Sequence, residues 1–268
     1  MPAVRKAGRR LPAGASALRK NRPMNALLPP PFTPLSSLDD ALFTQGHAVL
    51  APQALAEGVG QPLSALQDLH PFWERLPPDE HLKDGGRYRR RRHGSFTIEG
   101  GTLQPVPHRA HWQPVEYNAL HGGYERWFEP VEPALLQLPA WPRLMAFLAA
   151  RADALRGPQR WYGEAHAFRI DTTDGIGRPT PEGAHRDGVD LVAVMLLGRS
   201  HVKGGETRVF DAAGPQGLRF TMSEPFTLLL LDDARVIHET TPIQPEGGPG
   251  HRDTLVVTLR QGGFQGPR

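Results

Sequence analysis

Three residues in the second half of the chain have the donor types and spacing of a metal site. His185 and Asp187 are two positions apart in segment 181–188, so in an extended strand both side chains leave the same face. His238 follows 51 residues after Asp187, in a strand-like run. Two imidazoles and one carboxylate are the ligand set of non-haem iron(II) sites, which keep coordination positions open. The pattern therefore predicts an iron site that can take a bidentate co-substrate and dioxygen.

A candidate carboxylate anchor follows the third ligand. Arg252 comes 14 residues after His238, and Thr254 has the same strand parity as Arg252. A guanidinium group forms a bidentate pair with a carboxylate, and a nearby hydroxyl group adds one donor. We therefore expect Arg252 and Thr254 to hold the distal carboxylate of a keto-diacid co-substrate.

These residues must be positioned by short strands, because the sequence after residue 160 alternates apolar runs with glycine-rich turns. The expected strands are 161–171, 191–197, 204–211, 226–231, 236–240 and 254–259. Several short strands at this spacing are typical of a jelly-roll barrel. The predicted fold is mainly β with flanking helices, a double-stranded β-helix of the cupin-like kind.

The first part of the chain is expected to be helix-rich. A short helix is predicted at residues 41–43, after N-cap residues at 36–40 and before a stop at Gly46. Further short helices are predicted at 53–57 and 62–69, and a longer one at 142–156, which has an apolar stripe and ends at a Gly-Pro pair. We expect residues 1–34 to be a basic, proline-rich tail and 35–268 to be one domain. Within it, 35–158 is the helix-rich lead-in and 159–262 is the jelly-roll core.

Composition narrows the functional classes. The chain has no cysteine, which excludes disulfides, thiolate metal ligands and a cysteine nucleophile. It has no apolar run of membrane-spanning length, so we expect no membrane contact. The first 38 residues carry seven basic and no acidic residues, and the remainder has 24 basic against 28 acidic residues. We expect a cytoplasmic protein that does not bind nucleic acid, because the folded body is slightly acidic. A targeting peptide is the alternative for the tail, although its prolines oppose an amphipathic helix.

The arginine-rich run 87–92 admits two interpretations. Alone, it could bind nucleic-acid phosphates. The favoured interpretation is a strand whose arginines alternate between solvent and a polar, substrate-facing cavity.

With these motifs in hand, the chain resembles the iron(II)- and 2-oxoglutarate-dependent dioxygenases. Within them it is similar to the bacterial group of free L-isoleucine hydroxylases, some of whose members are known by biofilm, stress and motility phenotypes. The resemblance covers most of the chain after about residue 34. It is strongest in 168–170, 181–188, 204–207, 236–238 and 252–253. It implies iron ligation by His185, Asp187 and His238, and 2-oxoglutarate binding by Arg252. Arg186 replaces another polar residue of some members, so substrate specificity is not transferable.

The resemblance implies that iron(II), 2-oxoglutarate and O2 are used to hydroxylate an unactivated C–H bond of a small molecule. The expected substrate is a free L-amino acid, and the co-products are succinate and CO2. Glu182 and Arg169 are candidate contacts to its ammonium and carboxylate groups, with a structural salt bridge as the alternative for each. A homo-oligomer is left open. The competing interpretations are a zinc hydrolase with the same ligands and a non-catalytic jelly-roll module.

Overall fold

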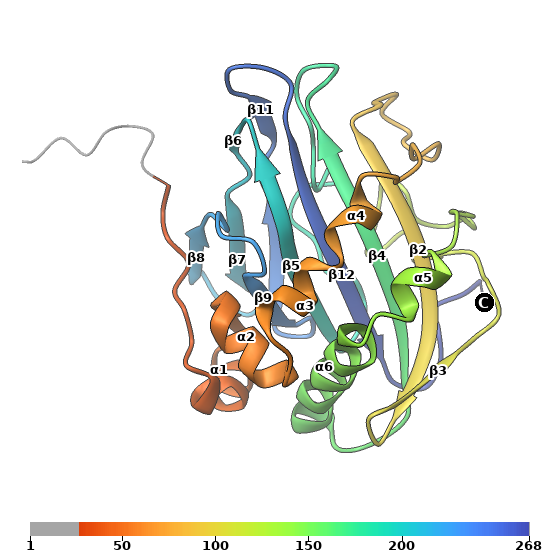
Figure 1. Cartoon of the computed structure of the whole chain (residues 1–268), viewed down its shortest axis with the longest axis vertical. Helices are drawn as coiled ribbons and strands as arrows, with labels where there is room; N and C mark the ends of the chain where they lie inside the picture. Colours follow the sequence, from red (N-terminus) through yellow and green to blue (C-terminus); the bar gives the residue numbers. More distant parts are fainter. Residues whose placement is uncertain (1–26, 268) are drawn as a thin grey trace, which may run out of the picture.

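A seven-stranded antiparallel sheet forms the centre of the molecule in the computed structural model, which describes residues 27–267. The strand order is β1-β9-β5-β12-β4-β2-β3. These strands are β1 (His47–Leu50), β2 (Arg89–Glu99), β3 (Thr102–Pro105), β4 (Trp161–Asp171), β5 (Leu191–Ser200), β9 (Leu228–Asp232) and β12 (His251–Arg260). Figure 1 shows β5, β12, β4 and β2 running side by side as the broad middle of this sheet.

A smaller sheet covers part of one face of the large one. It contains β7 (Thr207–Asp211), β8 (Gly217–Phe220) and β10 (Val236–Thr240), in the order β10-β7-β8. Strands β6 (Val202–Gly204) and β11 (Ile243–Pro245) form a separate pair. Apolar side chains of both sheets form one buried cluster, in which Val194 and Leu229 meet Val209 and Phe220. Two facing antiparallel sheets of this kind confirm the predicted jelly roll.

Helices cover the opposite face of the large sheet (Figure 1). They are η1 (Leu35–Ser37), α1 (Leu38–Gln45), α2 (Pro52–Val59), α3 (Leu63–Gln67), α4 (His70–Trp73), α5 (Pro133–Leu136) and α6 (Ala140–Arg156). The apolar side of α6, including Leu144 and Leu148, belongs to the larger core together with Met195 and Val257 of the sheet. No helix between residues 27 and 267 is long and apolar enough to cross a membrane.

Besides its helices, the predicted lead-in contributes β1, β2 and β3 to the large sheet. Strand β2 pairs with β4 over nearly its whole length. Residues 1–26 of the predicted tail lie outside the described residues. Its end lies against the domain, since the Thr33 amide donates to the Val49 carbonyl at 2.7 Å and the Leu28 carbonyl accepts from the Thr221 amide at 2.8 Å.

The arginine run forms part of β2, and its side chains alternate as expected. Arg89 and Arg91 are buried on the inner face of the sheet. Arg90 and Arg92 point outward, where Arg90 lies 3.6 Å from Asp171 and Arg92 lies 2.8 Å from Glu129. Two of the arginines thus face the interior between the sheets, where the predicted metal ligands also lie.

Candidate active site

The three predicted metal ligands meet at the middle of β10, where His238 lies. The backbones of His185 and His238 pair as an isolated antiparallel bridge, with N···O distances of 3.0 and 2.9 Å. Asp187 Oδ1 lies 3.8 Å from His185 Nε2, and its Oδ2 lies 3.8 Å from His238 Nε2. One ligand atom from each residue lies within 4.8 Å of the others, so a single ion could contact all three.

A buried carboxylate holds the turn that carries Asp187. Both oxygens of Asp233 accept backbone N–H groups, from Asp187 at 2.9 Å, Gly188 at 2.8 Å and Val189 at 3.1 Å. Gly188 has a positive φ of 74°, which glycine adopts without a Cβ clash. From the other side, Gln265 Nε2 donates to the carbonyls of Asp187 and Gly188 at 2.9 and 3.0 Å. The position of Asp187 is therefore fixed by its backbone.

The electrostatics of this cluster suit a cation. Burial raises the pKa of Asp187 to about 6, and the neighbouring carboxylates of Asp233 and Glu182 also raise it. Burial lowers the pKa of His238 well below its usual value, which keeps its imidazole neutral. Glu182 Oε1 lies 3.6 Å from His185 Nε2, and its buried Oε2 has no hydrogen-bond partner within residues 27–267. A divalent ion would supply the positive charge that these carboxylates lack.

Arg252 lies in the same cavity, where no carboxylate of residues 27–267 forms an ion pair with it. It is 3% exposed, and its Nε and Nη2 atoms find no hydrogen-bond partner in the described part of the chain. Burial, together with the positive charge of Arg199, lowers its pKa to about 10. Thr254 lines the same cavity, as the shared strand parity predicted. Because a buried guanidinium is costly without a partner, the site suits an anionic ligand.

The structure does not place Arg169 where a substrate contact was expected. Its guanidinium donates to Asp253 at 2.7 and 2.8 Å and to Glu74 at 2.8 and 3.1 Å, away from the residues that line the cavity. In the register of β4 and β12, Arg169 is opposite Asp253, whereas Arg252 is opposite Ile170. Successive residues of a strand face opposite sides of the sheet, so Arg169 takes the structural salt bridge that was its alternative.

A second group of metal-type side chains lies deeper in the interior. It comprises His93 of β2, His111 of the following loop, and Glu164 and His166 of β4, all buried, with ligand atoms within 4.8 Å of one another. Nη2 of Arg91 lies 2.7 Å from His166 Nδ1. Since a guanidinium can only donate, this imidazole carries its own proton on Nε2, and neither nitrogen is free for a metal.

The carboxylate of this second group is engaged in the same way. Glu164 accepts from Arg109 at 2.9 Å and lies 3.1 Å from His111 Nδ1, so that its oxygens are already paired. In contrast, no guanidinium contacts the donor atoms of His185, Asp187 or His238 within the described residues. We therefore place the candidate metal site at the latter three residues.

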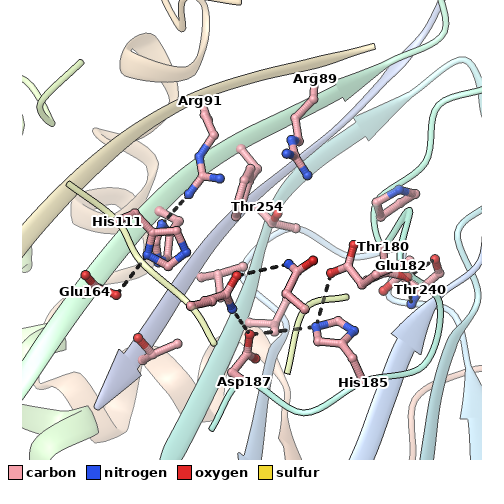
Figure 2. A pocket seen from close by; sticks show the side chains of 18 of the residues that line it. Arg89, Arg91, His111, Glu164, Thr180, Glu182, His185, Asp187, Thr240 and Thr254 are labelled. Carbon is pink, nitrogen blue, oxygen red and sulfur yellow. Dashed lines mark hydrogen bonds and ion pairs between the residues drawn. The ribbon is translucent and has the colours of Figure 1, made fainter. Parts of the chain in front are cut away.

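Several residues of the cavity were missed in the sequence. Gln113 donates from Nε2 to Asp187 Oδ1 at 3.1 Å, and its Oε1 accepts from Arg126 at 2.8 Å. Both come from the loop region between β3 and α5. Figure 2 shows the resulting site, with Arg89, Arg91 and Thr254 on one side and Asp187 and His185 on the other.

The geometry agrees with a family match. The model of the 2OG-Fe dioxygenase family matches residues 70–258, which contain all the candidate ligands and Arg252. The chain belongs to the 2OG-Fe dioxygenase family. As a family member it is a 2-oxoglutarate-dependent oxygenase that uses iron(II), 2-oxoglutarate and O2. No curated protein matches the sequence closely enough to count as a relative.

Solved structures agree with this assignment. A bsmA homolog from Methylobium petroleophilum PM1 is 57% identical, with 88% of this chain and 97% of that chain covered and a TM-score of 0.84. IDO from Bacillus thuringiensis is 17% identical, with 86% and 97% covered and a TM-score of 0.69. The Fe(II)/α-ketoglutarate-dependent dioxygenase TqaL is 21% identical, with 87% and 91% covered and a TM-score of 0.63. The last two show that this dioxygenase shares their fold.

Proposed function

We propose that this dioxygenase hydroxylates an unactivated C–H bond of a free L-amino acid, with release of succinate and CO2. The observation that best supports the proposal is the pairing of two features in one buried cavity. One is the facial group His185, Asp187 and His238, and the other is the uncompensated guanidinium of Arg252. The first suits iron(II) and the second suits the distal carboxylate of 2-oxoglutarate.

The donor set fits iron(II). His185 and His238 offer imidazole nitrogens and Asp187 offers a carboxylate, which suit a divalent metal that must keep open positions. When bound, the iron would supply the oxidising chemistry, with 2-oxoglutarate as the source of electrons. Gln113 steadies the Asp187 carboxylate through its 3.1 Å hydrogen bond to Oδ1. This bond occupies one lone pair of that oxygen and restricts the rotation of the carboxylate.

Arg252 and Thr254 would hold the co-substrate. Arg252 offers two buried, unpartnered N–H groups within residues 27–267, and Thr254 adds a hydroxyl group from the same strand face. Both side chains are 3% exposed, so they also keep water away from the bound carboxylate.

Glu182 would contact the ammonium group of the substrate. Its Oε2 atom is buried and unpartnered in the described residues, and the cavity that it lines also contains the metal ligands. An ammonium group would satisfy that oxygen and place the nearby C–H bonds beside the metal. The resemblance of segments 181–188 and 252–253 to the L-isoleucine hydroxylase group supports a free amino acid as the substrate.

The two alternatives from the sequence lose support. A zinc hydrolase would give Arg252 no task, and the matched family is one of oxygenases. A non-catalytic jelly-roll module would not need a facial ligand group next to an unpartnered guanidinium.

The test is substrate-dependent turnover. The purified protein is incubated with iron(II), ascorbate, 2-oxoglutarate and each proteinogenic L-amino acid in turn. We expect one or a few amino acids to accelerate succinate formation and to gain one oxygen atom in equal amount, as seen by mass spectrometry. Succinate formation that no amino acid changes, or that occurs without an oxygenated product, would remove the amino-acid substrate from the account.

A further inference from the structure

Three arginines other than Arg252 line the cavity. Arg89 and Arg91 come from the inner face of β2, and Arg126 comes from the loop region that also carries Gln113. They are 6%, 3% and 2% exposed, respectively. Figure 2 shows the guanidinium groups of Arg89 and Arg91 pointing from β2 into the space above Thr254 and Asp187. Guanidinium groups are rarely buried together unless anions compensate them.

Arg91 is held rigidly in this wall. Its guanidinium carbon lies 3.7 Å from the ring centroid of Phe128 and 4.5 Å from that of Phe168. Its Nη2 donates to His166, while its buried Nε finds no partner among residues 27–267. Such fixed placement lowers the entropic cost of binding an anion.

Each of the three arginines has a buried nitrogen donor that is not hydrogen-bonded to another described residue. Nη2 of Arg89 and Nε of Arg126 join Nε of Arg91 as atoms without a hydrogen-bond partner in the described chain. Unpartnered buried donors on three side chains of one cavity point to a ligand that accepts hydrogen bonds.

The ion pairs of the other charged residues leave an excess of positive charge on one side of the cavity. Arg89 forms a 2.7 Å ion pair with Asp79, and Arg109 forms a 2.9 Å ion pair with Glu164. Each pair is neutral as a unit. Asp79 is 4.0 Å from Arg91, so its main partner is Arg89.

Outside the metal and co-substrate positions, the cavity therefore has two positive charges, on Arg91 and Arg126. One lining carboxylate, that of Glu182, offsets them. Burial lowers the pKa of Arg91 well below its usual value, and the positive charges of Arg89 and Arg126 act in the same direction. When iron(II) is bound by Asp187 and 2-oxoglutarate by Arg252, that half of the site is neutral. The substrate half keeps one uncompensated positive charge.

Gln113 links Arg126 to the metal position through two hydrogen bonds. Its Oε1 accepts from Arg126 at 2.8 Å while its Nε2 donates to Asp187 at 3.1 Å. Arg126 is thus two hydrogen bonds away from a proposed iron ligand. An anionic group bound at Arg126 would therefore lie next to the reacting centre.

We propose that Arg91 and Arg126 form a carboxylate subsite and that the substrate carries a net charge of −1. With its ammonium group on Glu182, such a substrate is an amino acid with an acidic side chain. A zwitterionic aliphatic amino acid would leave one buried guanidinium uncompensated. The inference rests on the proposed function, because it concerns the substrate of the same cavity.

The test compares ligands of different charge, two pairs of which have the same shape. L-glutamate is paired with L-glutamine, L-aspartate with L-asparagine, and N-acetyl-L-leucine with L-leucine. Binding to the anaerobic complex with iron(II) and 2-oxoglutarate is measured by calorimetry, and succinate formation is measured in air. The variants are Arg91→Gln and Arg126→Gln. Arg90→Gln is the matched control, since Arg90 lies on the same strand and points outward.

We expect an acidic amino acid to bind roughly tenfold or more tightly than its amide, and both inner variants to abolish that preference. Arg90→Gln should keep it. If N-acetyl-L-leucine binds more tightly than L-leucine while glutamate and aspartate are inactive, the substrate charge of −1 is supported. The ammonium contact at Glu182 is then overturned. Amides or aliphatic zwitterions that bind as well as the acids, or a preference that both inner variants keep, would overturn the subsite.

Failure of the proposed function itself gives a different result. In that case no visible charge-transfer band develops with iron(II) and 2-oxoglutarate before any amino acid is added. The spectrum is therefore recorded first with the wild-type protein. Folding of each variant is checked by urea unfolding, because Arg91 and Arg126 also make hydrogen bonds to His166 and Gln113.

Discussion

Replacing Asp233 with asparagine perturbs the metal position without changing a ligand. The two oxygens of Asp233 accept three backbone N–H groups of the turn that carries Asp187, at 2.8–3.1 Å. Asparagine has one acceptor oxygen. It keeps the larger number of bonds when that oxygen accepts from Gly188 and Val189, and its amide group then faces the N–H donor of Asp187. The turn must then move, and Asp187 moves with it.

The size of the effect follows from these bonds. A hydrogen bond to a charged group contributes about 1.5–3 kcal/mol, so losing the bond to the Asp187 amide costs about 1.5–3 kcal/mol before the turn relaxes. The two remaining bonds also weaken, because their acceptor is no longer charged. Asp233 is fully buried, so water cannot replace the lost bond. A domain of ordinary stability, about 5–15 kcal/mol, stays folded after such a loss. Displacing a support of a metal ligand weakens metal affinity by roughly 10–100-fold.

The assay is an anaerobic titration of the metal-free protein with iron(II) in the presence of 2-oxoglutarate, combined with urea unfolding. Asp232→Asn is the matched control. Asp232 is the preceding residue, is equally buried, and pairs with Arg156 at 2.5 Å rather than with the ligand turn. It should lose stability while keeping its metal affinity. If Asp233→Asn binds iron as the wild type does, or if Asp232→Asn loses as much affinity, the supporting role of Asp233 is refuted.

Three further outcomes are expected. Arg252→Leu should raise the KM for 2-oxoglutarate about 30-fold or more without lowering the urea midpoint, because it removes an uncompensated buried charge; an unchanged KM would contradict its role. Arg169→Gln should lower the free energy of unfolding by about 3 kcal/mol by removing the main partner of Asp253, whose other ion-pair neighbour, His251, is 3.6 Å away. A raised KM would return Arg169 to the site. Burial lowers the pKa of His111 to about 3 and of His121 to about 4, from 6.5. Urea unfolding should therefore show stability that is complete above pH 6.5 and falls between pH 6.5 and 4, by about 1.4 kcal/mol per pH unit for each histidine; a flat profile would contradict neutral burial.

Spacing along the chain correctly predicted which side chains share one face of the same strand. The interval of two placed Arg252 and Thr254 on one face of β12, and the arginines of β2 alternate as expected. Arg169 was misassigned because its face depends on the register between β4 and β12. That register is set by pairing between segments more than 80 residues apart, which local spacing does not contain.

The second histidine group shows the same limit. His93, His111 and His166 come from β2, a loop and β4, and their closeness results from sheet pairing and loop packing. Glu164 and His166 have the spacing of two that was used for His185 and Asp187. What separates the two groups is the guanidinium on His166 Nδ1, which only the three-dimensional arrangement shows.

The most direct test of the central claim is the visible charge-transfer absorption of the anaerobic complex with iron(II) and 2-oxoglutarate. It is recorded for the wild type, His185→Ala and His93→Ala, after circular dichroism has shown that each is folded. The account predicts the band in the wild type and in His93→Ala, and its loss in His185→Ala. A band that persists in His185→Ala and disappears in His93→Ala would place the iron at the deeper group and contradict the assignment.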